Sequence, residues 1–304
     1  MKKTISLLLL FLGLLLLLLH PTVTVRAAAQ GLAIWYQNIL PALLPFAIIS
    51  DILISSNAFF QIARILHPLA RRILPCTKNG AFPVIAGFLF GFPMGSRICA
   101  QMVEEGKLSH QEASTIFVIS NNISPIFITS YIVHDRMRAD HLILPVLLLL
   151  YVPPLIYGRI AYRRMQNLSK QTETAPRLKM DFSIVDAGIM NGFEILCKLG
   201  GYIMLFSILT AFLQLYISHP LWQTVLAAPL EITNGIALIT AAGYPARIAF
   251  TGVIALTSMG GICGIAQTYS MVSRVRLPMK RYVLIKFLLA LSSGSIAYMI
   301  YPYL

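Results

Sequence analysis

The sequence has little charge and few residues that bind metals or attack substrates. Only 12% of its 304 residues are charged, whereas 57% are hydrophobic, so the chain is too apolar for a soluble domain. The four cysteines lie far apart without CxxC spacing and no HExxH pair occurs, so no zinc site or disulfide framework is indicated. There is also no phosphate loop and no nucleophile motif. We therefore expect neither an enzyme nor a metal or organic cofactor.

The net charge of +13 does not indicate nucleic-acid binding. The basic residues cluster between apolar segments, which is the distribution that the positive-inside rule describes for membrane proteins. No basic groove with a stacking platform is visible. The composition predicts an all-α, polytopic membrane protein whose partners are the lipid bilayer and a small solute. Whether copies of the chain form a homo-oligomer is left open.

Residues 1–30 allow two interpretations. Two lysines precede an unbroken apolar run over residues 5–19, and the three alanines at 27–29 resemble a signal-peptide cleavage site. Extended through residue 25, the run reaches about 20 residues, which is enough to cross a bilayer. We favour an uncleaved N-terminal transmembrane anchor, with the amino terminus in the cytoplasm, over a signal peptide.

The remaining chain divides into two halves of similar plan, residues 31–162 and 184–304. A polar and basic linker at 163–183, expected in the cytoplasm, separates them. Each half contains one apolar segment that proline or glycine interrupts, and neither part of it is long enough to span the membrane. We expect these segments to be re-entrant helical hairpins, over residues 80–108 with its tip at FGFPMG and over 221–243 with its tip at LEITNG.

Each half also contains a broken transmembrane helix, over residues 112–133 and 246–273. A helix that opens at a polar or glycine-rich break frees backbone groups to face a cavity. Residues 58–75 form an amphipathic pattern that predicts a helix in the membrane interface, and Ser109 with Glu112 predicts a helix-capping box. Simple spans are expected over residues 32–54, 142–162, 184–217 and 287–301.

The distribution of basic residues gives the two halves opposite orientations. With both hairpins re-entrant, 19 of the 24 Lys and Arg residues lie on the cytoplasmic side or in the first hairpin, and Lys286 is counted among these 19. The sequence thus predicts inverted repeats, whose hairpin tips and helix breaks meet near the midplane as in secondary transporters. A scaffold of ten simple spans, with glycines serving helix packing, is the alternative. The five exceptions are Arg26, Arg136, Arg138 and Arg247 outside, and Lys198 within a span.

The main candidate ligand is Glu231 at the second tip. An acidic side chain among apolar residues costs roughly 2.5–3.5 kcal/mol on insertion scales, unless a partner satisfies it. Glu231 can bind the substrate or a coupling ion, H+ or Na+; a structural ion pair is the alternative. Asn234 at the same tip is either a ligand or a turn residue. At the first break, Asn121, Asn122 and Ser124 can bond a polar ligand or satisfy freed backbone groups.

The remaining candidates shape the site or carry charge near it. Arg97 can attract an anion or hold the first hairpin at the interface. Glu194 and Lys198, four residues apart, are expected to neutralise each other. Gln267 is a weaker candidate two turns beyond the second break. Gly91, Pro93, Gly95, Gly260 and Gly261 are expected to shape the tips and breaks, although backbone amides that they expose can bind carboxylates.

Four motifs in a fixed order carry a resemblance to a known family. They are FGFPMGSRICAQMVEEGKLSHQEA, NNISPIFI, PLEITNGI and SMGGICGIAQ. Together they resemble the nucleoside recognition (Gate) domain family over roughly residues 30–300, especially sporulation integral membrane proteins of the YlbJ type. That family is similar in plan to concentrative nucleoside transporters, whose repeats each pair a re-entrant hairpin with an unwound helix.

The resemblance implies a substrate and a location. It implies transport of dipicolinic acid, a small polar and anionic heterocycle, during sporulation of a bacterium. The location implied is the cell membrane, and within it the outer forespore membrane. A nucleoside transporter and a non-transporting membrane scaffold in spore assembly stay open as alternatives.

Overall fold

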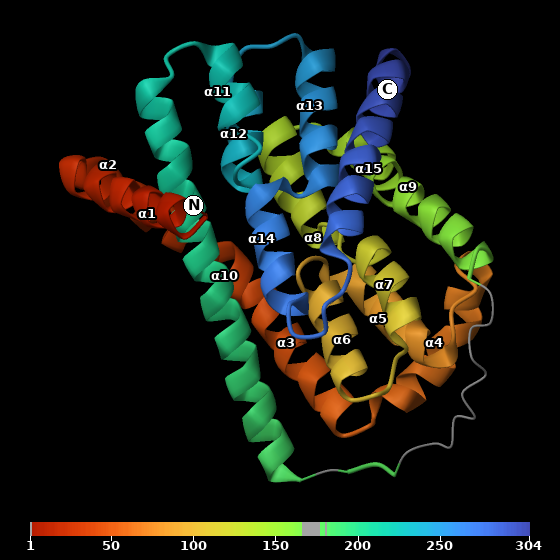
Figure 1. Ribbon diagram of the computed structural model, residues 1–304. Coiled ribbons are helices and arrows are strands. Elements are labelled where there is room, and N and C mark those ends of the chain that lie inside the picture. The colour runs from red at the N-terminus through yellow and green to blue at the C-terminus, as the bar shows by residue number, and fades with distance from the viewer. Residues whose placement is uncertain (1, 166–176, 180) are drawn as a thin grey trace.

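The computed structural model describes residues 2–165, 177–179 and 181–304, and these are helical with short connections (Figure 1). Within them, five helices are long and apolar enough to cross a membrane, or six if one bent pair counts as a span. The expectation of an all-α, multi-pass membrane protein is confirmed. Most of the predicted linker at 163–183 lies outside the described residues.

The N-terminal helices are divided differently from the expected spans over 5–25 and 32–54. Helix α1 (Lys2–Leu19) ends before His20, and α2 (Pro21–Ile34) runs through a π-helical turn, η1 (Trp35–Ile39), into α3 (Leu40–Ser55). Pro21 starts a new helix because it has no amide hydrogen with which to continue the first one. Residues 21–55 therefore form one 35-residue apolar helical run.

The first interrupted segment forms two helices that pack together. Helix α5 (Lys78–Phe90) ends at Gly91, which has a φ of 78°, and α6 (Met94–Glu104) begins after Pro93. The amphipathic helix expected before it is α4 (Phe59–Ile73), which meets α5 at a bend of 79°. This bend occurs at residues 74–77, where the chain is extended and Thr77 caps α5 by accepting a hydrogen bond from the Gly80 amide.

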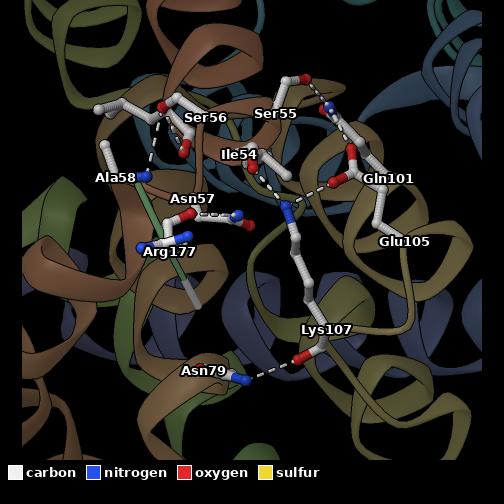
Figure 2. Close-up of polar contacts among 11 residues, drawn as sticks. Ile54, Ser55, Ser56, Asn57, Ala58, Asn79, Gln101, Glu105, Lys107 and Arg177 are labelled. Atoms are coloured by element: carbon white, nitrogen blue, oxygen red, sulfur yellow. Dashed lines mark hydrogen bonds and ion pairs between the residues drawn. The ribbon is translucent and has the colours of Figure 1, made fainter. Parts of the chain in front are cut away.

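The end of this segment is tied to α3 by polar contacts (Figure 2). Lys107 donates from Nζ to the backbone oxygen of Ile54 and forms an ion pair with Glu105. Gln101 donates to Glu105 over 3.0 Å and to Ser55 over 3.4 Å. The ammonium thus satisfies a backbone acceptor at the carboxyl end of α3, where cations are favourable. These contacts fix the base of the α5–α6 pair.

Both halves of the chain contain interrupted helices. In the first, α7 (His110–Ile119), a break, α8 (Pro125–Phe127) with η2 (Ile128–Met137), and the turn η3 (Asp140–Leu142) lead into the long helix α9 (Ile143–Arg163). The second half starts with α10 (Phe182–Tyr216), followed by the interrupted pair α11 (Pro220–Leu226) and α12 (Ile232–Ala241). Helices α13 (Ala246–Met259), α14 (Gly261–Val272) and α15 (Met279–Ile300), with the terminal turn η4 (Tyr301–Tyr303), complete it.

The breaks fall where the sequence places them, but they differ in form. The first covers five residues, 120–124, whereas the second is the single residue Gly260 in the left-handed conformation, with a φ of 83°. The second broken helix stays straight enough to count as one 27-residue span. In Figure 1, α6, α8, α12 and α14 gather between α10 and α9, and contacts join α6 to α14 and α12 to η2. This gathering positions the candidate site.

Candidate functional site

A cavity of about 640 Å³ lies where the two tips, the first break, α14 and α3 meet. The first tip contributes Phe92, the first break contributes Ile123 and Ser124, and the second tip contributes Glu231 and Thr233. Helix α14 and the η1–α3 segment close the other sides. A groove of about 770 Å³ between α9 and α15 is larger, but its lining is almost wholly apolar and suits contact with lipid. The polar cavity is therefore the candidate site.

Glu231 lines this cavity and also caps α12. Its carboxylate accepts hydrogen bonds from the amides of Thr233, over 3.1 Å, and of Asn234, over 2.9 Å, and a further one from the Thr233 hydroxyl. The side chain is 3% exposed. A helix N-terminus favours a negative charge and carries amides that need acceptors. The carboxylate is thus held at the cavity wall by the backbone of its own hairpin.

Asn234 does not line the 640 Å³ cavity. Its side-chain amide donates to the Ser207 hydroxyl of α10 over 3.1 Å. It faces a separate pocket of about 200 Å³ that α2, α10 and α12 form. The prediction that it acts beside Glu231 at one site therefore has no geometric support here. Glu231 precedes the first helical residue and has an extended backbone, so the helical spacing of α12 does not place its side chain on the face that Asn234 presents to α10.

The two asparagines of the first break are buried and hold the break to the second half. Asn121 donates to the hydroxyls of Thr268, over 2.7 Å, and Tyr282, over 2.6 Å. Asn122 accepts a hydrogen bond from Lys286 over 2.9 Å, and its backbone oxygen accepts one from the Phe92 amide over 2.6 Å. Neither side chain lines the 640 Å³ cavity. The break is thus fixed by α14, α15 and the first tip together.

Two of the predicted residues do face the cavity beside Glu231. Ser124 lines it and caps α8, where its hydroxyl accepts a hydrogen bond from the Phe127 amide over 3.3 Å. Gln267 lines it from α14 and donates to the sulfur of Cys263 over 3.2 Å. These polar groups at separate walls can orient a polar solute.

The five residues predicted to shape the tips and breaks do not line the 640 Å³ cavity. They are Gly91, Pro93, Gly95, Gly260 and Gly261. A β-carbon at Gly91 would lie 2.5 Å from the backbone nitrogen of Ser124, and one at Gly95 would lie 2.4 Å from the oxygen of Ser120. The first tip can therefore approach the first break only without side chains at these positions. The peptide bond between Phe92 and Pro93 is cis.

The second break is closed by backbone hydrogen bonds. The amides of Ile262 and Cys263 donate to the oxygens of Pro229 and Leu230, each over 2.8 Å. Gly260 and Gly261 both have a positive φ, of 83° and 70°. The amides of the second and third residues after Gly260 are therefore engaged by the second tip, and are not free to bind a carboxylate.

The secondary charged candidates lie outside the cavity. Arg97 is 3.7 Å from Asp51, which also accepts a hydrogen bond from Asn191 over 3.1 Å. Arg97 thus joins α6 to α3 and α10. Glu194 and Lys198 form an ion pair on the exposed face of α10, with side chains 60% and 52% exposed. Their expected mutual neutralisation is what the geometry shows.

Sequence reasoning missed Lys286. It was counted among the cytoplasmic basic residues, yet the structure buries its side chain in α15, where it is 2% exposed and bonded to Asn122. The available signal was its neighbourhood, because VLI precedes it and FLLAL follows, whereas Lys280 and Arg281 stand at the start of the helix. Reasoning also passed over cavity-lining polar residues on η1 and η2: Gln37, Asn38, Tyr131 and Asp135.

The charged side chains that line the cavity are acidic. Among the described residues these are Glu231 and Asp135, and no lysine or arginine lines it. An acidic lining favours a cation or a neutral polar solute, and an anion would need a compensating positive charge.

Comparison with known proteins gives one relative. No family model matches the chain, and no solved structure matches it. The chain is similar to sporulation integral membrane protein YlbJ of Bacillus subtilis, with 31% identity over 109 residues, which is 36% of this chain. The matched part spans 27% of the relative's length. The similarity and the apolar helices together fit a multi-pass membrane protein.

Proposed function

We propose that the chain is a secondary transporter that moves a small polar heterocycle through the 640 Å³ cavity. The observation that carries this proposal is the meeting of two helix tips, the first helix break and α14, from both halves, around one cavity with Glu231 and other polar groups in its wall. Broken helices that surround a central polar site are how secondary transporters bind substrate and coupling ion. A scaffold has no need of such a cavity.

The same proposal includes inverted repeats. We take α5–α6 and α11–α12 as re-entrant hairpins, and α7–η2 and α13–α14 as the broken spans of the two repeats. The common order of elements in the two halves supports this, as does the excess of basic residues on one side. The amino terminus then lies in the cytoplasm. Alternating access would come from one block rocking against the other around the tips.

Dipicolinic acid is the first candidate substrate, in a bacterial cell membrane and there in the outer forespore membrane. The relative is named as a sporulation protein, and the resemblance of the motifs implies this solute. The acidic lining adds a condition, because a dianion would be repelled by Glu231 and Asp135. We propose that it binds together with a proton or another cation.

A nucleoside is the second candidate. The observation that favours it is the lining itself, which offers amide, hydroxyl and carboxylate groups but no basic side chain among the described residues. A neutral polar heterocycle needs hydrogen-bond partners and no counter-charge. Dipicolinate and uridine therefore make a direct test of substrate charge.

Counterflow in proteoliposomes tests the proposed function. Vesicles are loaded with unlabelled solute, and entry of labelled dipicolinate or uridine is followed without any ion gradient. We expect exchange of at least one solute, and its loss in Glu231→Gln and in Asn122→Ala with membrane levels unchanged. Glu194→Gln is the matched control, because it removes an exposed carboxylate outside the cavity. We expect that variant to exchange at the wild-type rate.

The scaffold alternative makes the opposite prediction. A scaffold would show no exchange of either solute, and Glu231→Gln combined with Asn122→Ala would be tolerated in cells. Dipicolinate content of spores with and without the protein is the corresponding measurement in cells. Normal content without the protein would contradict the dipicolinate proposal.

A further inference from the structure

A lysine is buried in the second half at a position that the proposed cavity does not use. Lys286 lies two turns into α15, with a side chain that is 2% exposed. Its Nζ donates to the side-chain oxygen of Asn122 over 2.9 Å. An ammonium buried against one neutral amide is rare unless it has a function.

The surroundings of Lys286 contain no carboxylate. Among the described residues, a small closed pocket around it is lined from the first tip, the first break, α13–α14 and α15. The one other titratable group in that lining is Tyr282, one turn earlier on α15, whose hydroxyl accepts a hydrogen bond from Asn121. The side-chain oxygen of Asn121 has no hydrogen-bond partner. The pocket lining is Phe92, Asn121, Ile123, Thr257, Gly260, Gly264, Tyr282 and Lys286.

The ammonium of Lys286 lies against a side-chain oxygen at an interrupted helix. In broken-helix transporters, oxygens at an unwound helix coordinate the ion that drives transport. Here the oxygen of Asn122, at the first break, is already engaged by a positive charge that the chain itself carries. Unlike a metal ion, a lysine can release its charge as a proton.

We propose that Lys286 fills the cation site of the first break and is the group that binds and releases the coupling proton. This inference rests on the proposed transport function. The step is Lys286–NH3+ giving Lys286–NH2 and a proton, which passes to water in the 640 Å³ cavity on the other side of the Phe92 ring. The charge on α15 then alternates during the cycle, and no sodium ion is needed at this break.

Two contacts connect this charge to the cavity. Phe92 and Gly264 line both the Lys286 pocket and the 640 Å³ cavity, so the Phe92 ring lies between the pocket and the cavity. A β-carbon at Gly264 would lie 3.0 Å from that ring, which shows how closely they pack. Asn122 accepts from Lys286 through its side chain and from the Phe92 amide through its backbone. A single residue, Asn122, thus connects Lys286 to the first tip, which lines the proposed substrate cavity.

The test separates exchange from accumulation in proteoliposomes. Labelled dipicolinate and uridine are the probes, with a one-unit pH gradient, a tenfold sodium gradient, or neither. One proton per solute allows a one-unit pH gradient to support roughly tenfold accumulation. We expect wild-type protein to accumulate solute with the pH gradient and not with the sodium gradient. Lys286→Met should lose this accumulation and still exchange solute in counterflow.

A matched control and a second variant complete the design. Lys280→Met removes an exposed lysine from the same helix and should keep both exchange and pH-driven accumulation. Where Lys286→Met fails to insert, Lys286→Gln replaces it, because glutamine keeps a donor for Asn122. This design distinguishes coupling from folding.

The possible outcomes distinguish failure of the proposed function from failure of this inference alone. No wild-type counterflow of either probe contradicts the proposed function and this inference with it. Wild-type counterflow with sodium-driven accumulation overturns the inference alone, and needs no variant. Retained pH-driven accumulation in Lys286→Met or Lys286→Gln also overturns it.

Discussion

One helix break lies in each half of the chain, and the two breaks are stabilised in different ways. The first break, residues 120–124, is held by side chains that come from the second half and by the Phe92 amide of the first tip. The second break, Gly260, is closed by two backbone hydrogen bonds from its own hairpin. A polar break needs partner side chains, whereas a glycine break needs only a backbone that accepts a positive φ.

This difference assigns the breaks different mechanical roles. The first break joins the halves, because Asn121 and Asn122 bond to α14 and α15. The second break joins the α11–α12 hairpin to the broken helix that follows it. Movement of one half against the other would therefore change the contacts of the first break more than those of the second.

The largest expected loss of stability is that of Gly95→Ala, at the contact between α6 and the first break. The new β-carbon would lie 2.4 Å from the backbone oxygen of Ser120, so the tip and the break must separate. Overpacking of this kind costs about 3 kcal/mol or more when the obstacle is backbone. Thermal unfolding in detergent measures the loss. Gly201→Ala is the control, because no atom lies within 4 Å of its β-carbon, and it should be neutral or slightly stabilising.

Gly260→Ala should have a smaller effect at the second break. No atom lies within 4 Å of the added β-carbon, but φ is 83°, which costs an L-residue about 1–2 kcal/mol. Gly260→Asn should lose less, since asparagine tolerates this conformation better than alanine. The same unfolding measurement applies. A loss as large as that of Gly95→Ala would contradict the distinction between a packed break and a conformational one.

The smallest effect is expected for Tyr282→Phe. This change removes one of the two hydroxyls that the Asn121 amide contacts, and Thr268 remains at 2.7 Å. Side-chain hydrogen bonds between membrane helices contribute about 0.6 kcal/mol on average. Tyr298→Phe, on a half-exposed face of the same helix, is the control and should leave stability unchanged. A loss beyond that of Gly260→Ala would show that the side-chain contacts are the dominant support of the first break.

The positions of the helix breaks could be predicted because their causes are local. Glycine and proline change backbone freedom or remove a donor at the residue where they stand. The tips at Gly91–Pro93 and Glu231, and the break at Gly260, follow from this. The boundary at His20 was missed because the run on both sides of Pro21 is apolar, and hydropathy alone does not divide it.

The membership of the site could be predicted only in part. Glu231, Ser124 and Gln267 line the cavity, whereas Asn234, Arg97, Glu194 and Lys198 do not. Ser109 caps α7 as its pattern predicts, yet the Glu112 carboxylate accepts from Thr77 and Tyr162. Local pattern identified the cap, but the partners of a carboxylate depend on which helices pack beside it.

The sequence by itself determined that the protein is an all-helical membrane protein with interrupted helices at known positions. Composition, hydropathy and the backbone chemistry of glycine and proline act within a few residues, so they are readable along the chain. Only the tertiary structure decided which polar side chains meet. The partners that Asn121 and Asn122 have in the second half lie 147 to 164 residues away. Their contact depends on helix rotation and packing, which bring α14 and α15 against the first break.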